Sequence, residues 1–266
     1  MNKNSLADRM KGYENISRIY LTKRNPVIIR VDGKSFHTFT KGFIRPFDGV
    51  LMETMAETAK YLCENVSGCK LAFVQSDEIS LLITDYDTKD TQPWFENNLQ
   101  KLVSISASMA TLAFNRIFSE KAQSVLNSPD PANDNKKYSA ALRSAISKGA
   151  VFDSRAFILP KEEVCNYFVW RQQDATRNSI LMVAQSCFSH EEIKGIKCDT
   201  LQDKLFRERN INWNDCTIPQ KRGTCVIKRL VERNGVMRHK WVIDNEIPIF
   251  TKDVSYINEL VYVNTD

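Results

Sequence analysis

The order of strand and helix patterns in the first 160 residues limits the fold of this chain more than any other feature. Apolar residues recur at helical spacing in two segments, and four shorter apolar runs have the length and flanking turns of buried strands. In chain order the segments are a strand at 26–31, a helix at 47–66, strands at 71–74 and 79–83, a helix at 94–118 and a strand at 150–159. This β-α-β-β-α-β series predicts an α+β fold of the ferredoxin-like type.

That arrangement has a geometric consequence for the acidic residues. Its first two strands are parallel, and the third runs antiparallel between them. The end of the first strand therefore shares a sheet edge with the turn that joins the second and third strands. Asp32 follows the first strand, and Asp77 and Glu78 lie in that turn. We expect these three carboxylates to face one another at one edge of the sheet.

The second half of the chain predicts helices followed by a hairpin. A long helix is expected from Lys161 to about Phe188, and a second helical stretch at 201–209. Asn234-Gly235 is a strong signal for a two-residue hairpin turn. Residues 119–139 are rich in Ser, Asn, Asp and Pro and predict a long exposed loop.

These patterns also suggest how the chain is divided. We expect residues 1–160 to form a core, and residues 161–266 to form a helical and β-hairpin extension packed on it, in one continuous domain.

Composition narrows the class of protein. Hydrophobic residues make up 42% of the 266 residues, which excludes disorder as the main state. The seven cysteines include no CxxC pair, which argues against a structural zinc site and favours reduced thiols in the cytoplasm. No uninterrupted apolar run reaches the length of a membrane span, and the first residues show no secretory signal, so we expect no membrane partner.

Positive charge is concentrated near the C-terminus. Residues 221–240 hold seven Lys and Arg against the single acid Glu232, whereas the net charge of the whole chain is +5. A basic stripe of this kind is typical of a surface that binds a polyphosphate backbone. Lys228, Arg229 and Arg233 are the candidate contacts to RNA.

Carboxylates that converge on a sheet edge suit a two-metal phosphoryl-transfer site, because Mg²⁺ takes a few carboxylates together with phosphate oxygens and water. Asp32 and Asp77 are then the metal ligands, with Glu78 as a ligand or an outer acceptor and the Gly33 carbonyl as a further ligand. A plain turn and a solvated hairpin tip explain the same spacing equally well.

The segment after the first strand, 32–37, supplies closely spaced backbone N–H groups that are able to hold an anion, although it has no Walker-type pattern. His37 is placed to touch a phosphate or simply to stabilise the turn. Lys101 lies on the polar side of the predicted 94–118 helix and is able to reach a triphosphate, but a solvated helix face is the commoner explanation.

One face of the long helix after Lys161 carries polar side chains at helical spacing: Tyr167, Arg171, Asp174 and Asn178. A buried Arg171–Asp174 pair that holds the helix to the core accounts for this face as well as a catalytic or RNA-binding role does.

Several motifs together identify a family resemblance. They are IIRVDGKSFHTF, RPFD at 45–48, FVQSDEISLLI, Trp94-Phe95 with Lys101, FDSRAFILP, YFVWRQQDATRNS and NINWN followed by KRGT. From about Tyr13 to Thr224, this ordered set resembles the tRNA-histidine guanylyltransferase family.

The resemblance implies a core similar to polymerase palm domains, two Mg²⁺ ions, ATP and GTP as substrates, tRNA as partner and a homotetramer. It implies that Asp32, the Gly33 carbonyl and Asp77 hold the metal, with Glu78 beside them. It places the triphosphate on Lys101 and on the backbone of Gly33, Lys34, Ser35, Phe36 and His37. Arg45 and Ser76 fall where the family contacts the activating nucleotide.

The implied reaction adds a nucleotide to a tRNA 5′ end after adenylylation by ATP, in the 3′-to-5′ direction. Eukaryotic members typically carry His-Ile-Asn-Asn where this chain has Thr176-Arg177-Asn178-Ser179, and the family favours Lys where Arg45 stands. The first departure resembles the guanylyltransferase-like members, which implies template-dependent repair of tRNA 5′ ends.

Three alternatives stay open at this point. They are strict addition of one G to tRNA-His, a palm-type nucleotidyl cyclase, and a tRNA-binding protein without catalysis. A cyclase does not need the basic stripe at 221–240, and a binding protein does not need Asp32 and Asp77.

Overall fold

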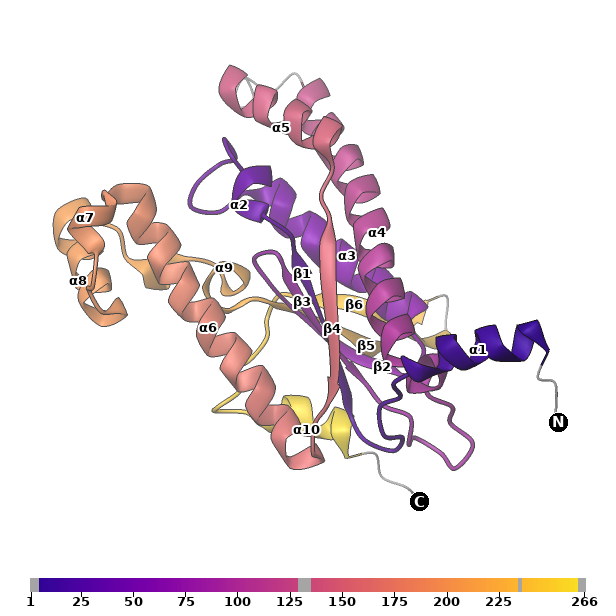
Figure 1. Cartoon of the computed structure of the whole chain (residues 1–266). Coiled ribbons are helices and arrows are strands. Elements are labelled where there is room, and N and C mark those ends of the chain that lie inside the picture. Colours follow the sequence, from indigo (N-terminus) through magenta and orange to yellow (C-terminus); the bar gives the residue numbers. More distant parts are fainter. Residues whose placement is uncertain (1–4, 129–134, 234–235, 263–266) are drawn as a thin grey trace.

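The computed structural model describes residues 5–128, 135–233 and 236–262, and it contains one six-stranded sheet flanked by helices (Figure 1). Every neighbouring pair of strands is antiparallel, and the order across the sheet is β4-β1-β3-β2-β5-β6. The strands are β1 (Val27–Gly33), β2 (Cys69–Gln75), β3 (Glu78–Ile83), β4 (Phe152–Ile158), β5 (Thr224–Arg233) and β6 (Val236–Asp244). The fold is therefore mixed α/β with an antiparallel sheet.

The expected relation between the first three strands is confirmed. Because β3 pairs antiparallel with both β1 and β2, those two strands are parallel and β3 lies between them. Asp32 lies directly opposite Glu78 in the register, and the Gly33 amide donates to the Asp77 carbonyl at 3.1 Å. The acidic residues of the two segments thus meet at one edge of the sheet.

Helices cover both faces of the sheet, which explains why β1 is almost continuously apolar. α3 (Gly49–Asn65) and α4 (Leu99–Asn127) share a core with Ile29 and Val31, whereas α6 (Lys161–Cys187) and α10 (Ser255–Val261) pack on the face that carries Ile28 (Figure 1). The remaining helices are α1 (Leu6–Ile16), α2 (Phe36–Phe39), α5 (Lys136–Lys148), α7 (His190–Ile193), α8 (Cys198–Arg209) and α9 (Ile218–Arg222), with 3₁₀ turns at Trp94–Asn97 and Trp213–Asp215.

The predicted exposed loop at 119–139 is wrong for most of its length. α4 continues through Asn127 and α5 begins at Lys136, while residues 129–134 lie outside the described part of the chain. Ala122 is fully buried, and Val125 and Leu126 pack against the core, which continues the apolar stripe of Phe118 by helical spacing. The polar composition of this segment concealed that period.

The helix predicted from Trp94 begins later, at Leu99. Phe95, Glu96 and Asn97 all have positive φ, so the chain turns sharply before the helix. The Asn98 side chain then accepts from the Lys101 amide at 3.0 Å and caps the first turn of α4. Among the described residues, α4 is the one helix that is long and apolar enough, by length and composition alone, to cross a membrane. Its Leu102, Phe114 and Phe118 side chains are buried in the core.

The C-terminal hairpin extends the same sheet that residues 1–160 begin. β5 pairs with β2 from Thr224 to Ile227, and beyond that point it pairs only with β6. The register brings Arg233 opposite Val236, while the predicted turn residues Asn234-Gly235 lie outside the described residues. The proposed division at residue 160 therefore runs through one shared sheet.

A glycine in the turn before β2 is required by close packing. Gly68 has a φ of 76°, and a Cβ at this position would lie 2.4 Å from the Thr84 carbonyl oxygen. We expect Gly68→Ala to lower the free energy of unfolding by about 2 kcal/mol, measured by urea unfolding. Gly12→Ala in exposed α1 is the control: a Cβ there meets nothing within 4 Å, so little loss or a small gain is expected. Equal losses in the two variants would contradict this account.

Candidate active site

A cavity of about 650 Å³ opens at the sheet edge where the acidic residues meet. Its walls come from the end of β1 and the turn after it, the β2–β3 turn, the loop before α3, the middle of α6, and α9. The lining residues that the sequence pointed to are Asp32, Gly33, Ser35, Phe36, His37, Arg45, Ser76, Asp77 and Asn178. This volume is within the range of small-molecule sites.

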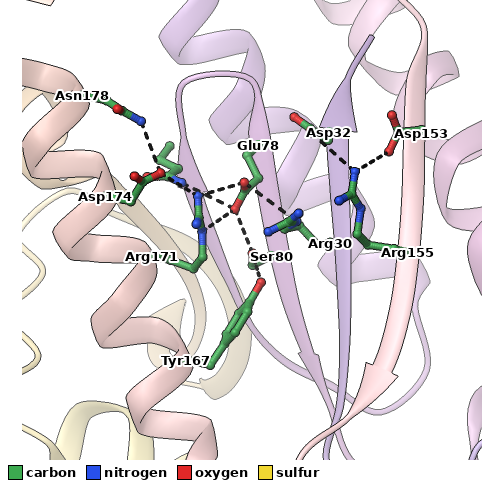
Figure 2. Close-up of polar contacts among 11 residues, drawn as sticks. Arg30, Asp32, Glu78, Ser80, Asp153, Arg155, Tyr167, Arg171, Asp174 and Asn178 are labelled. Atoms are coloured by element: carbon green, nitrogen blue, oxygen red, sulfur yellow. Dashed lines mark hydrogen bonds and ion pairs between the residues drawn. The ribbon is translucent and has the colours of Figure 1, made fainter. Parts of the chain in front are cut away.

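Asp32 and Asp77 lie on this cavity with little positive charge to balance them. Burial raises the pKa of the Asp77 carboxyl. Hydrogen bonds from the Ser76 hydroxyl, at 3.0 Å, and from the backbone amide of Asp77 itself oppose this rise, whereas the negative charge of Asp32 adds to the rise. Asp32 has one weak cationic partner, Arg155 at 3.8 Å, which also contacts Asp153 (Figure 2). The two carboxylates therefore repel each other across the cavity mouth.

These oxygens suit a hard divalent cation. In the described part of the chain, no group of three or more His, Cys, Asp and Glu side chains forms a metal site, so a cation here would depend on Asp32, Asp77 and backbone oxygen. The buried Gln75 Oε1 on the same wall has no hydrogen-bond partner within the described residues. Two carboxylates, a carbonyl and an unused amide oxygen match the ligand preference of Mg²⁺, which completes its shell with water or phosphate.

Glu78 has a different environment from Asp77, although the two are adjacent. Arg171 donates to both oxygens of Glu78, from Nε at 2.8 Å and from a terminal nitrogen at 3.0 Å, and Arg30 lies 3.9 Å away (Figure 2). Burial raises the pKa of Glu78, and the two guanidinium groups oppose that rise. Because its carboxylate is already bound and does not line the cavity, Glu78 does not fit the metal-ligand role that the sequence suggested for it.

The polar face of α6 points toward the sheet. The Arg171 side chain is only 6% exposed and also bonds Asp174 at 3.0 Å. Burial alone would raise the pKa of Asp174, but the hydrogen bond from Arg177 and the charge of Arg171 lower it. Asn178 donates to Asp174 at 3.3 Å and reaches the cavity (Figure 2). Arg171 thus holds α6 to β3, with Asp174 as a second partner of its guanidinium, and the prediction that Arg171 contacts tRNA does not fit this burial.

The expected phosphate-binding segment is only partly free. The Gly33 and Lys34 amides already donate, to Asp77 and to Val151. Ser35 has a left-handed backbone and begins the short helix α2, so the amides of Ser35, Phe36 and His37 precede the first hydrogen bond inside that helix. A Cβ on Gly33 would lie 2.2 Å from the Phe36 ring, which explains why glycine is required there.

Two predicted nucleotide contacts lie outside the cavity. Lys34 is exposed and is not a lining residue. Lys101 lies in the first turn of α4, where its ammonium group contacts the Phe95 ring. The part of α4 that lies near Gly33 is ten residues further along: the Thr111 hydroxyl accepts from the amide of Phe152, which is paired with Gly33. Ten helical residues span about 15 Å. Lys101 therefore lies about 15 Å along α4 from the part of the helix beside Gly33, and its contact with a triphosphate stays a prediction.

Sequence patterns missed part of the cavity wall. Gln75, Met182, Gln185 and Gln220 line it, and so does the apolar loop from Phe43 to Phe47. Gln220 lies on α9, a five-residue helix too short to give a periodic signal. Met182 and Gln185 continue the face of α6 that carries Asn178, so helical spacing alone was enough to find them.

Two carboxylates without a strong counter-cation beside a ligand-sized cavity suit an enzyme of metal-assisted phosphoryl transfer. The family model described as tRNA-His guanylyltransferase matches residues 7–160, and the chain belongs to this family of nucleotidyltransferases.

Similar proteins have been described in bacteria and in yeast. The chain is 29% identical to the tRNA(His) guanylyltransferase of Schizosaccharomyces pombe over 87% of this chain and 83% of that protein. A bacterial tRNA(His) guanylyltransferase-like protein solved in complex with ATP is 50% identical, with a TM-score of 0.82 over 97% of this chain and 100% of that one. A structure described in the same words, in complex with GTP, is 47% identical, with a TM-score of 0.79 and the same coverage.

The Arg171–Glu78 pair predicts a large effect on stability. Arg171→Met leaves Glu78 buried without its main cation, and we expect the free energy of unfolding to fall by about 3 kcal/mol. Arg177→Met is the matched control, because the Arg177 side chain is 62% exposed on the same helix, and a loss below about 1 kcal/mol is expected. Urea unfolding of both variants measures the difference. Equal stability would instead favour a functional role for Arg171.

Removal of the charge of Asp77 is expected to have the opposite effect and to stabilise the folded chain. Because the pKa of Asp77 is raised in the folded chain, its contribution to stability is present at low pH and is lost as the pH rises through the raised value. Asp77→Asn should therefore increase the melting temperature at pH 7 to 8 in the presence of a chelator, and the gain should shrink toward pH 4. Asp153→Asn, at an exposed carboxylate nearby, is expected to change little. A lower melting temperature for Asp77→Asn at pH 8 would contradict this.

Proposed function

We propose that the protein repairs truncated tRNA 5′ ends by adding nucleotides in the 3′-to-5′ direction, under the guidance of a template strand. The observation that carries the proposal is the cavity at which Asp32 and Asp77 lie together without a strong counter-cation. The similarity to a bacterial relative solved with ATP and with GTP supports two nucleotides as substrates. The strand order β4-β1-β3-β2 supports a ferredoxin-like core of the polymerase palm type.

Asp32, the Gly33 carbonyl and Asp77 would hold two Mg²⁺ ions. When bound, Mg²⁺ supplies charge stabilisation for the attacking and leaving oxygens of phosphoryl transfer. The amides of Ser35, Phe36 and His37 and the exposed guanidinium of Arg45 would hold phosphate oxygens in the same cavity. Ser76 also lines the cavity, and its hydroxyl orients Asp77 by donating to the carboxylate.

The proposed reaction has two steps. An oxygen of the tRNA 5′-phosphate first attacks the α-phosphorus of ATP, so that pyrophosphate leaves and AMP becomes linked to the 5′ end. The 3′-hydroxyl of GTP, or of another nucleoside triphosphate, then attacks the 5′-phosphorus of the tRNA and AMP leaves. A tRNA that already carries a 5′-triphosphate needs no activation, and pyrophosphate leaves in the single step.

The choice of repair over strict G addition rests on the Thr176–Ser179 segment. Asn178 and Ser179 line the cavity, and the Ser179 hydroxyl accepts from the Trp213 indole at 2.9 Å. In this wall Asn178 matches the third position of the His-Ile-Asn-Asn stretch typical of eukaryotic members, whereas Ser179 replaces its last Asn. We propose that pairing with a template base, rather than this segment, selects the nucleotide.

The proposal extends to partners and location. The basic hairpin β5–β6, which carries Arg229, would bind tRNA. A homotetramer is supported by α1, which buries none of its residues and exposes Leu6, Met10, Tyr13 and Ile16. All seven cysteines are free, which suits the reducing cytoplasm.

Purified protein should extend a tRNA that lacks its 5′-terminal nucleotide when Mg²⁺, ATP and GTP are present. Asp32→Ala and Asp77→Ala should each lower the rate at least a hundredfold with tRNA affinity nearly unchanged, because they remove metal ligands rather than the RNA surface. Asp90→Ala, at an exposed acid in the segment after β3, is the control and should keep full activity. Sequencing of product 5′ ends, with each nucleoside triphosphate offered alone, measures both rate and template use.

The outcomes separate the alternatives. No extension of truncated or full-length tRNA would overturn the proposal. Addition of a single G to full-length tRNA-His alone would indicate the strict guanylyltransferase, and turnover of triphosphates without RNA would indicate a cyclase. Loss of tRNA binding together with activity in both Asp variants would point to a structural role for these carboxylates.

A further inference from the structure

The β5–β6 hairpin projects beyond the rest of the sheet and has two chemically different faces. Residues paired across an antiparallel ribbon share a face, and successive residues along a strand alternate between faces. The register therefore assigns one face to Arg229, Val231, Val236, Arg238 and Lys240, with Val236 paired to Arg233. It assigns the other face to Lys228, Leu230, Glu232, Met237, His239 and Trp241.

The first face, defined by Arg229, Val231, Val236, Arg238 and Lys240 and called here the basic face, presents unpaired positive charge beside the exposed side chain of Val236. Arg238 and Lys240 are exposed, and they form no ion pair or hydrogen bond with any residue that the structure describes. Arg229 is 54% exposed and is held in place by the buried carboxylate of Asp244. Two free cations and one anchored guanidinium thus point to the same side.

The opposite face is of mixed character. The ammonium group of Lys228 lies over the Trp241 ring at 5.2 Å from its centroid, so this cation already has a partner. Glu232 adds a negative charge, and Leu230 and Met237 are exposed apolar side chains. A polyanion therefore gains little on this face, in contrast to the prediction from the sequence that Lys228 contacts RNA.

The basic face is continuous with the side of the sheet that carries Asp32. The register connects Asp32 to Glu78, Glu78 to Gln75 and, two residues back along β2, Phe73 to Cys225. Cys225 and Arg229 are four residues apart on β5 and therefore share a face. The cavity and the basic face thus belong to one side of a single twisted sheet.

Distance adds a second constraint. β5 leaves the cavity end of the sheet at Thr224, which pairs with Val74. At about 3.3 Å per residue, Arg229 lies about 17 Å further along the strand, and Arg238, opposite Val231, about 23 Å. A ligand that occupies both the cavity and the basic face must be a long anion with repeated charges, which describes the sugar–phosphate backbone of an RNA.

We infer that Arg229, Arg238 and Lys240 bind the phosphate backbone of the tRNA whose 5′ end is held at Asp32 and Asp77, and that Lys228 does not. This inference rests on the proposed function, since it takes the cavity to be the 5′-end site. It adds Arg238 and Lys240 to the RNA surface and places that surface on one face of the hairpin.

Two double variants with equal net charge test this inference. Arg238→Gln/Lys240→Gln removes two positive charges from the basic face, and Lys228→Gln/Leu230→Glu lowers the charge of the opposite face by the same amount. We expect the first variant to raise the Kd for tRNA about tenfold at 0.1 M salt and to reduce the slope of log Kd against log salt by about 1.8, the value for two duplex phosphate contacts. The second variant should stay within about twofold of the unchanged protein. Circular dichroism and melting temperature confirm that both variants fold.

Each outcome has a defined meaning. Equal weakening by the two variants, or greater weakening by the second, would overturn the face assignment. Unchanged RNA affinity in both would also overturn it and leave an acidic protein surface as the partner of the hairpin. Activity at saturating tRNA is measured separately. If the two variants differ in tRNA affinity as expected but the unchanged protein does not extend tRNA 5′ ends, the proposed function alone is refuted. If the unchanged protein extends 5′ ends but the two variants bind tRNA equally well, this inference alone is refuted.

Discussion

The buried ion pair between Glu78 and Arg171 is the contact on which the site depends. It joins the first residue of β3 to the middle of α6, and both side chains are almost fully enclosed. Because a buried charge is costly without its partner, the pair fixes how close α6 lies to the sheet edge. Asn178, two turns after Arg171, reaches the cavity only when that distance is kept. The cavity wall is therefore set by electrostatics as well as by apolar packing.

The turn before β3 separates two carboxylates with opposite roles. Ser76 has a positive φ, and after it the chain turns Asp77 toward the cavity and Glu78 toward α6. Burial raises the pKa of both carboxyl groups, but two guanidinium groups oppose the rise at Glu78, whereas no cation among the described residues opposes it at Asp77. In the described part of the chain, Asp77 is therefore the carboxylate without a cationic partner, and it is the one that a ligand cation would stabilise.

Periodicity was sufficient to predict β1, α3, β2, β3 and α6, and topology then brought Asp32 and Asp77 together. Periodicity was not sufficient where a polar segment or a charged side chain is buried. The polar segment after Phe118 is helical because three apolar residues in it reach the core, and Arg171 faces inward because Glu78 meets it there. The neighbouring sequence shows neither the core contact after Phe118 nor the Glu78 carboxylate that binds Arg171. The separation of Lys228 from Arg229, in contrast, follows from strand alternation and needed no structure.

The position of the basic face relative to the cavity is fixed by the register of β5. A shift of one residue would turn every side chain of this strand to the other face. Cys225 and Val226 are both fully buried, on opposite sides of the sheet, and Asp244 is buried where it binds Arg229. A slip of one residue that moves Lys228 into the place of Ile227 would press its charge against one of the two cores, at a cost of several kcal/mol. The apolar core thus determines on which side of the sheet, and at what distance from Asp32, the free positive charge is presented.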